Sequence, residues 1–358
     1  MDSVTQAALG AVVGHSLMGR KIGYIAPVIG AALGTLPDLD VLIAFGGEVE
    51  DFTFHRGFSH SLFIQLLATP ILVWLILKGH AASRPYRTQW AITVLAILWT
   101  HTFLDAFTVY GTQLLWPFTD YPFGISSVFI IDPLYTVPLL LGLLFAGIWG
   151  WRTKKATKAT LIALCLSTVY LGWSLTAKAL LHNKLDSALT QQEIEPQAIL
   201  STPTPFNTLI WRVVILEENH YRVSHVALWE EPETIEFRAY PKGEQLLEGI
   251  SEHWDTARLK WFTKGFYRAS ERDMHIVMTD LRMGFENNYA FNFAIGTLLP
   301  SGVIEAKRAV RIEDQIEMKR LGLLWRRLWD DSVSLHPTRL NAPEISYEHS
   351  NSECGKSC

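Results

Sequence analysis

The chain has 358 residues, of which 49% are hydrophobic, and its mean hydropathy is +0.16. An ordinary soluble domain of this length is less apolar, so the composition indicates a membrane protein. The formal net charge of -4 and the pI near 6.3 give no basic field of the kind that binds nucleic acid, so we expect no nucleic-acid partner. The three cysteines, one in an apolar run and two at the C-terminal end, support neither a disulfide framework nor a thiolate metal site.

Long apolar runs are confined to the first half of the chain. They are of membrane-spanning length or close to it and cover about residues 3–19, 22–45, 61–77, 90–109, 128–151 and 159–180. Because a membrane-spanning helix needs about 20 apolar residues, these runs predict an all-α transmembrane bundle of six helices. The first run is short and rich in glycine, and if it lies at the interface or re-enters the membrane, five spans remain. We also expect the N-terminal segment to be retained, because it has no basic leader region.

Charged residues alternate between the connections that join these runs. The basic connections contain Arg20, Lys21, Lys78, Arg84, Arg87, Arg152, Lys154, Lys155 and Lys158. The acidic connections contain Glu48, Glu50, Asp51 and Asp120. Because basic connections stay in the cytoplasm, the alternation predicts a multi-pass protein whose acidic connections and C-terminal part lie outside the cytoplasm.

Beyond residue 182 the apolar runs give way to short segments rich in β-branched and aromatic residues. The segments at 209–216, 221–229, 234–240 and 275–281 are typical of strands, and those at 244–263 and 313–331 have helical spacing. Together they predict a smaller α+β domain with an antiparallel sheet. The polar, proline-containing end is expected to be a disordered tail. The predicted domains are residues 1–182, 183–335 and 336–358.

Six His and Asp residues of the membrane half are the candidate metal ligands: Asp38, Asp40, His55, His60, His101 and Asp105. An aspartate at the centre of a membrane helix costs about 2.5 to 3.5 kcal/mol, so ionisable residues in apolar runs are functional candidates by default. By depth along the helices, at about 1.5 Å per residue, all six come to the same membrane face. Imidazole and carboxylate groups together suit transition metals. The coincidence predicts a divalent metal site, with zinc as the first expectation and manganese or iron as the alternatives.

Each part of this set also has a plainer interpretation. The two aspartates of GTLPDLD, which follow Pro37, could be solvated carboxylates at a helix cap. Histidines are common in loops, so the two histidines of HRGFSHS could be ordinary loop residues that bind no metal. His101 and Asp105 lie four residues apart, and therefore on one helix face, where they could form a hydrogen-bonded pair without a metal.

Three further polar residues lie in or beside the apolar runs. Gln6 lies near the outer end of the first run, whereas His15 lies about 13 Å deeper and is interpreted as a packed histidine. Asp132 precedes Pro133 and is interpreted as a helix cap, with hydrogen bonding to a ligand imidazole as the alternative.

The motifs MDSVTQ, GTLPDLD, HRGFSHS and HTFLDAFTVYGTQLLWPF follow one another in that order. Read together, they make the chain resemble a bacterial family of inner-membrane proteins regarded as metal-dependent hydrolases, some of them LexA-regulated and distantly grouped with zinc-dependent phospholipase C. The resemblance covers the first 180 residues and extends into the second half through TPFNTLIWR, FTKGFY and DLRMG. It implies a location in the bacterial inner membrane, so the C-terminal domain, which the charge pattern places outside the cytoplasm, is predicted on the periplasmic side. The N-terminal histidine of the family corresponds to Gln6, so the chain departs from the family pattern at that position.

We therefore predict a membrane-bound, metal-dependent hydrolase, and the resemblance makes a phosphoester or phospholipid its natural substrate. A bound metal lowers the pKa of its water to about 7 and polarises the bond to be cleaved. Asp38 or Asp40, whichever is not coordinated, is expected to act as general base, and Arg56 to face a phosphate oxygen or lipid headgroups. The lipid bilayer is the expected partner. The alternative is a non-enzymatic membrane protein whose His and Asp cluster serves ion transport or fixes helix packing.

Overall fold

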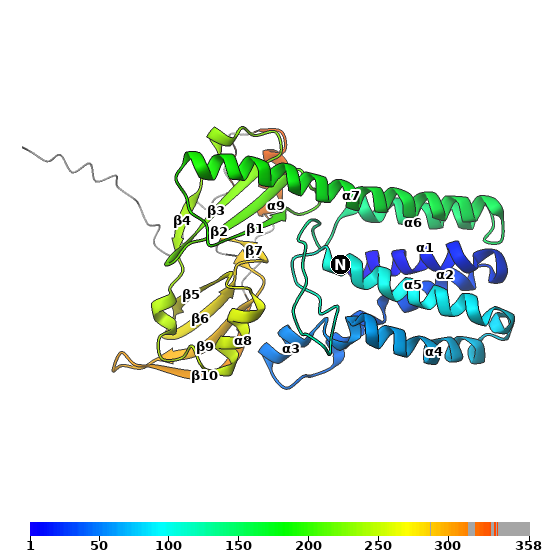
Figure 1. Ribbon diagram of the computed structural model, residues 1–358, viewed down its shortest axis with the longest axis horizontal. Coiled ribbons are helices and arrows are strands. Elements are labelled where there is room, and N and C mark those ends of the chain that lie inside the picture. Colours follow the sequence, from blue (N-terminus) through cyan, green and yellow to red (C-terminus); the bar gives the residue numbers. More distant parts are fainter. Residues whose placement is uncertain (287, 314–318, 331–332, 334, 336–358) are drawn as a thin grey trace, which may run out of the picture.

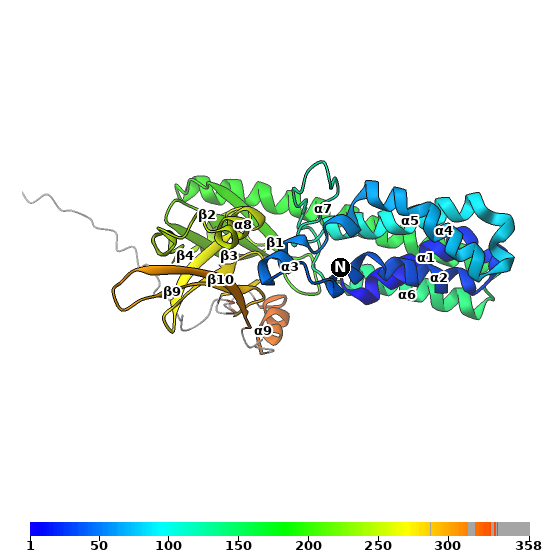
Figure 2. The ribbon, with the colours of Figure 1, turned by 90° about the horizontal axis from the view of Figure 1, so that it is seen from below.

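The computed structural model describes residues 1–286, 288–313, 319–330, 333 and 335, and these residues form two parts (Figure 1). A bundle of helices forms one end of the molecule and two β-sheets form the other. The view from below shows the same arrangement (Figure 2). The predicted order, a helical first half followed by a domain with antiparallel sheets, is confirmed.

Each predicted apolar run overlaps one α-helix of the bundle. The bundle consists of α1 (Ser3–Ile22), α2 (Ile25–Thr35), α4 (Leu62–Gly79), α5 (Arg87–Ala106), α6 (Pro133–Ile148) and α7 (Lys154–Gln191). Among the described residues, α4 and α7 are long and apolar enough to cross a membrane by length and composition, and α2 and α6 are shorter apolar helices. The helical character of the first half is thus confirmed, whereas five or six membrane spans stay a prediction.

The connection between α2 and α4 contains only short helical segments. α2 ends at Thr35, before its apolar run does, because Pro37 has no backbone donor and begins a 3₁₀ turn, η1 (Pro37–Leu42). α3 (Glu48–Phe54) and a second 3₁₀ turn, η2 (Phe58–His60), follow. Four of the six predicted metal ligands therefore lie on one irregular connection.

Glycines bring α1 and α2 into close contact. A Cβ atom at Gly10 would lie 2.3 Å from the carbonyl oxygen of Gly30 and 2.8 Å from the Cα atom of Gly34. Only glycine permits such an approach, as at the small-residue crossings of membrane helices. The crossing fixes the C-terminal end of α2, which carries Gly34, within the bundle.

Two four-stranded antiparallel sheets form the second part of the molecule. The first has the order β1-β2-β3-β4 and comprises β1 (Ala198–Pro203), β2 (Ile210–Leu216), β3 (His220–Ala227) and β4 (Arg238–Pro241). The second has the order β10-β9-β6-β5 and comprises β5 (Tyr267–Arg272), β6 (His275–Asp280), β9 (Asn292–Leu298) and β10 (Ile304–Ile312). The remaining described elements are the pair β7 (Gly284–Phe285) and β8 (Asn288–Tyr289), and the helices α8 (Trp254–Phe262) and α9 (Lys319–Arg327).

The first helix predicted in this part is shorter than its sequence pattern. The segment 244–263 forms a 3₁₀ turn at Glu244–Leu247 and then α8, because the chain turns between them at Gly249, whose φ is +82°. The pattern at 313–331 contains α9, although several of its residues lie outside the described part. The predicted tail, 336–358, also lies outside it.

An aromatic core joins the two parts. The ring of Phe52 in α3 lies with its centroid 5.0 Å from that of Phe262 in α8 and 5.2 Å from that of Phe293 in β9. Tyr110, which follows α5, packs against Phe52 at 5.5 Å. The carbonyl oxygen of Tyr110 accepts a hydrogen bond of 3.1 Å from Arg282 of the sheet domain. The connection that carries the predicted ligands is therefore held by the sheet domain as well as by the bundle.

α7 passes from the bundle into the sheet domain without a break (Figure 1). Leu181 and Leu185 are fully buried and belong to the same apolar cluster as Trp211 of β2. The predicted domain boundary at residue 182 thus falls inside a continuous helix that packs in both parts.

Candidate metal centre

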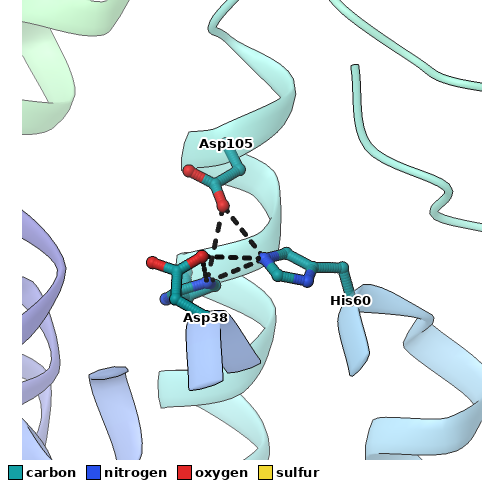
Figure 3. Close-up of side chains that lie close together, drawn as sticks. Asp38, His60 and Asp105 are labelled. Carbon is teal, nitrogen blue, oxygen red and sulfur yellow. Dashed lines mark hydrogen bonds and ion pairs between the residues drawn. The ribbon is translucent and has the colours of Figure 1, made fainter. Parts of the chain in front are cut away.

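Four side chains converge where the bundle meets the sheet domain. They are Asp38 of η1, His60 of η2, and His101 and Asp105 of α5, and their ligand atoms all lie within 4.8 Å of one another. The Nε2 atom of His60 lies 3.1 Å from Asp105 Oδ2, 3.4 Å from Asp38 Oδ1 and 3.1 Å from the Nε2 atom of His101. Figure 3 shows Asp38, His60 and Asp105 pointing toward a common centre from three segments of the chain.

The local structure explains why these side chains meet. His101 and Asp105 lie one turn apart on the buried face of α5, as their spacing predicts. Asp38 reaches the same place because Pro37 prevents α2 from continuing and begins the 3₁₀ turn η1, which carries Asp38. His60 lies directly before Ser61, whose hydroxyl accepts the backbone N–H of Ile64 and caps α4.

Each of the two imidazole rings is oriented by a hydrogen bond at Nδ1, the nitrogen that faces away from the centre. His101 Nδ1 lies 2.7 Å from the carbonyl oxygen of Gly34, which can only accept, so Nδ1 donates and Nε2 presents a lone pair to the centre. His60 Nδ1 lies 2.8 Å from the hydroxyl of Ser59. Such outer hydrogen bonds orient the histidine ligands of metal ions in proteins.

The donor set fits a divalent cation. Asp38 Oδ1 is buried and has no hydrogen-bond partner, although it faces both imidazole rings. Burial alone would lower the pKa of His60, but Asp105 and Asp38 outweigh it and raise that pKa. Two carboxylates therefore favour positive charge at the centre, and two imidazoles supply the nitrogen ligands that transition metals bind.

Asp40 and His55 lie beside these four residues and make different contacts. His55 Nδ1 lies 2.7 Å from Asp40 Oδ1, so the carboxylate orients the ring. Asp40 Oδ2 accepts the Ser59 hydroxyl at 2.6 Å and the backbone N–H of Arg56 at 3.0 Å. Both carboxylate oxygens of Asp40 are therefore hydrogen-bonded within the loop. Ser59 also links Asp40 to Nδ1 of His60, the ring nitrogen that faces away from the centre.

Arg56 places a buried positive charge against the centre. Its Nη2 atom lies 3.4 Å from Asp105 Oδ1, and its Nη1 donates to the hydroxyl of Thr108 at 3.1 Å, while its Nε has no hydrogen-bond partner. The backbone of Arg56 has φ +61°, a conformation that costs a non-glycine residue free energy and recurs at functional sites. The Nε–H of the guanidinium thus remains available to an anion.

Gln6 also lies at the centre. It is fully buried and its Nε2 donates to Asp105 Oδ1 at 3.0 Å, on the side where the N-terminal amino group of Met1 also contacts that carboxylate. Its Oε1 atom is buried without a hydrogen-bond partner. Gln6 therefore orients Asp105.

The other two polar residues discussed from the sequence are not at the centre. His15 contacts Thr160 and the carbonyl oxygen of Trp151, so it is a packed histidine as predicted. Asp132 accepts the N–H of Leu134 at the start of α6, which confirms the predicted cap. Two further groups at the centre were not predicted: Ser59, although HRGFSHS places it next to His60, and the carbonyl of Gly34, which no side-chain pattern reveals.

Comparisons with known proteins agree with the motifs. The sequence model of the YdjM inner membrane protein family matches residues 1–181. The chain is 26% identical over 226 residues to the Bacillus subtilis (strain 168) protein YfhP, which is described as uncharacterized. That alignment covers 58% of this chain and 66% of YfhP, so the chain spans just under two thirds of that relative. No solved structure matches the chain.

Proposed function

The chain belongs to the YdjM family of inner membrane proteins, and from that premise we propose that it is a membrane-bound, metal-dependent hydrolase of phosphoesters. The observation that carries the proposal is the convergence of Asp38, His60, His101 and Asp105, the four residues proposed to hold the ion. The side chain of Asp38 is 17% exposed, whereas the other three are at most 1% exposed. Asp38 is therefore the least buried side of the cluster, and we propose that a substrate approaches the ion from that side.

A bound divalent ion supplies Lewis acidity, which polarises a phosphoryl oxygen and makes a water molecule more acidic. In its neutral form His55 donates from Nδ1 to Asp40, so its Nε2 is available to accept a proton from the attacking water. Arg56 offers its free Nε–H to a non-bridging phosphate oxygen. In this proposal Asp38 is a ligand, and Asp40 acts through His55 instead of holding the ion as the sequence suggested.

The surroundings of the opening favour a lipid as the substrate. Leu39, Val41 and Leu42, in the same turn as Asp38, are 50%, 68% and 79% exposed. An exposed apolar patch of this kind marks a site of membrane or protein contact. We propose that these side chains lie in the outer leaflet and that a phospholipid reaches the centre past them.

The distribution of charge supports the proposed orientation in the inner membrane. The basic connections α1–α2, α4–α5 and α6–α7 all lie at the end of the bundle remote from the sheets (Figure 1). The acidic connections and the metal centre lie at the other end. The positive-inside rule would then place the centre and the sheet domain on the periplasmic side of a multi-pass protein.

Elemental analysis of the detergent-solubilised protein tests the metal, and turnover of phosphoesters tests the reaction. We expect stoichiometric zinc, manganese or iron in the wild type and in the control His275→Ala, whose histidine is exposed on β6. His60→Ala and His101→Ala should lose the metal. Folded wild type without metal after expression in metal-supplemented medium would refute the proposal, and bound metal without hydrolysis of any phosphoester would leave the transport alternative.

A further inference from the structure

A groove of about 470 Å³ lies between α6 and α7, near the end of the bundle that carries the basic connections. Its wall is apolar and includes Leu141, Phe145, Trp149, Ile162 and Leu166, and two lysines complete the lining. The groove lies at the opposite end of the bundle from the metal centre, so it belongs to no step of the proposed hydrolysis.

The close packing of the two helices forms the floor of the groove. A Cβ atom at Gly142 of α6 would lie 2.4 Å from the Cβ of Ala163 in α7, so the helices touch there without side chains between them. The rings of Phe145 and Trp149 stack at 5.3 Å along one wall. From Lys155 to Leu166 the groove extends about 16 Å by the helix rise. That is about half of the 30 Å hydrocarbon core, the depth of the acyl chains of one leaflet.

Two ammonium groups stand at the mouth of the groove. Lys155 and Lys158 are three residues apart on α7, and therefore on the same face, and both are exposed. The sequence contains no Asp or Glu between residues 133 and 185, so neither α6 nor the part of α7 that lines the groove offers the lysines a carboxylate. The two positive charges are therefore available to an anionic group of another molecule.

We propose that this groove binds an anionic phospholipid of the inner leaflet, with one acyl chain along the apolar wall and the phosphate between Lys155 and Lys158. Basic pockets between membrane helices are typical sites for anionic headgroups. A second copy of the chain fits the groove less well. In the same membrane it would present its own basic end at this depth, and residues 3–37 and 62–104 contain no Asp or Glu either.

Native mass spectrometry of the detergent-solubilised protein tests the site with phosphatidylglycerol and phosphatidylcholine as probes. We expect phosphatidylglycerol to bind preferentially, and Lys155→Gln with Lys158→Gln to weaken it roughly 30-fold, from about 1 kcal/mol for each lysine near a membrane surface. The matched control, Arg20→Gln with Lys154→Gln, removes two charges from the same end of the bundle but outside the groove lining, and should bind like the wild type. Leu166→Trp should fill the groove and weaken both lipids.

Three results would overturn the proposal: equal affinity for the two lipids, equal losses in the groove and control variants, or a dimer whose α6 and α7 are crosslinked across copies. The metal content serves as a folding control, because it should be the same in all these variants. Phosphatidylglycerol that binds at the metal centre as a substrate is distinguished by His60→Ala, which should leave the groove site intact.

Discussion

The Nε2 atoms of His60 and His101 lie 3.1 Å apart, and each ring is fixed through its Nδ1, that of His60 by the adjacent Ser59 and that of His101 by the carbonyl of Gly34 in α2. Two Nε2 atoms at this distance can share either a proton or a bound cation. With two carboxylates at the same centre, the arrangement is compatible with a bound divalent cation.

Ser59→Ala should weaken metal binding without removing a ligand. The Ser59 hydroxyl donates to Asp40 and contacts His60 Nδ1, so its loss frees the ring to rotate. Removal of such an outer partner typically lowers metal affinity about 10- to 100-fold. Competition with a chromogenic chelator measures the change, and Ser187→Ala, on an exposed face of α7, is the control. Unchanged affinity would mean that the ring is held by its packing alone.

His55→Ala should retain the metal and lose turnover. Its contact with Asp40 makes it a proton acceptor in the proposed mechanism, and general-base catalysis typically contributes about 10²- to 10⁴-fold in rate. Metal content and phosphoester turnover are measured on the same preparation. If the variant loses its metal instead, His55 is a ligand, as the sequence predicted.

Replacement of Leu39 and Leu42 by glutamine should separate lipid substrates from soluble ones. The two side chains lie on the exposed side of η1 next to Asp38, and the polar variant no longer favours contact with the bilayer. We expect slower hydrolysis of phospholipid in vesicles at an unchanged rate for a water-soluble phosphoester. Equal loss on both substrates would point to damage at the centre and not to lipid access.

Acid should destabilise the sheet domain through Glu286. Burial would raise its pKa, but Arg212, whose Nη2 lies 2.8 Å from Glu286 Oε1, and the nearby His225 lower it from 4.5 to about 2. Because the pKa is lower in the folded state, the contribution is complete above pH 4.5 and is lost as the pH falls toward 2. It amounts to about 3 kcal/mol.

Thermal unfolding of the wild type and of Glu286→Gln, followed from pH 6 to pH 2.5, measures this contribution as the difference between the two proteins. The variant should be less stable at pH 6, because Arg212 then lies buried without a charge partner. The gap should narrow as the wild-type carboxylate becomes protonated. A constant gap across this range would show that the ion pair does not control the acid response.

Much of the centre could be predicted because local geometry fixes it. A spacing of four residues places His101 and Asp105 on one face of any helix. Pro37 indicates the turn that carries Asp38. The helical first half and the antiparallel strands likewise follow from the period of the apolar pattern.

The roles of Asp38 and Asp40 could not be separated in the same way. They are two residues apart in a turn, and which one faces the centre depends on the packing of a connection whose partners lie far away in the sequence. Phe52, which anchors that connection, has its ring neighbours at Phe262 and Phe293, more than 200 residues later. No local pattern contains that information, and for the same reason the sequence did not reveal the carbonyl of Gly34 as a neighbour of the ligands. Gln6, in contrast, is expected on the side of the ligands from its position near the outer end of the first apolar run.

The position of Phe52 in the core of the sheet domain links two equilibria. The folding of the sheets and the ordering of the loop that carries His55 and His60 depend on the same buried contacts. A ligand that binds only the ordered loop must therefore also stabilise the sheets. A metal titration followed by hydrogen exchange would then show slower exchange in β6 and β9, which contribute no ligand. Hydrogen exchange in the C-terminal half of the chain would therefore report whether a metal ion is bound at the centre.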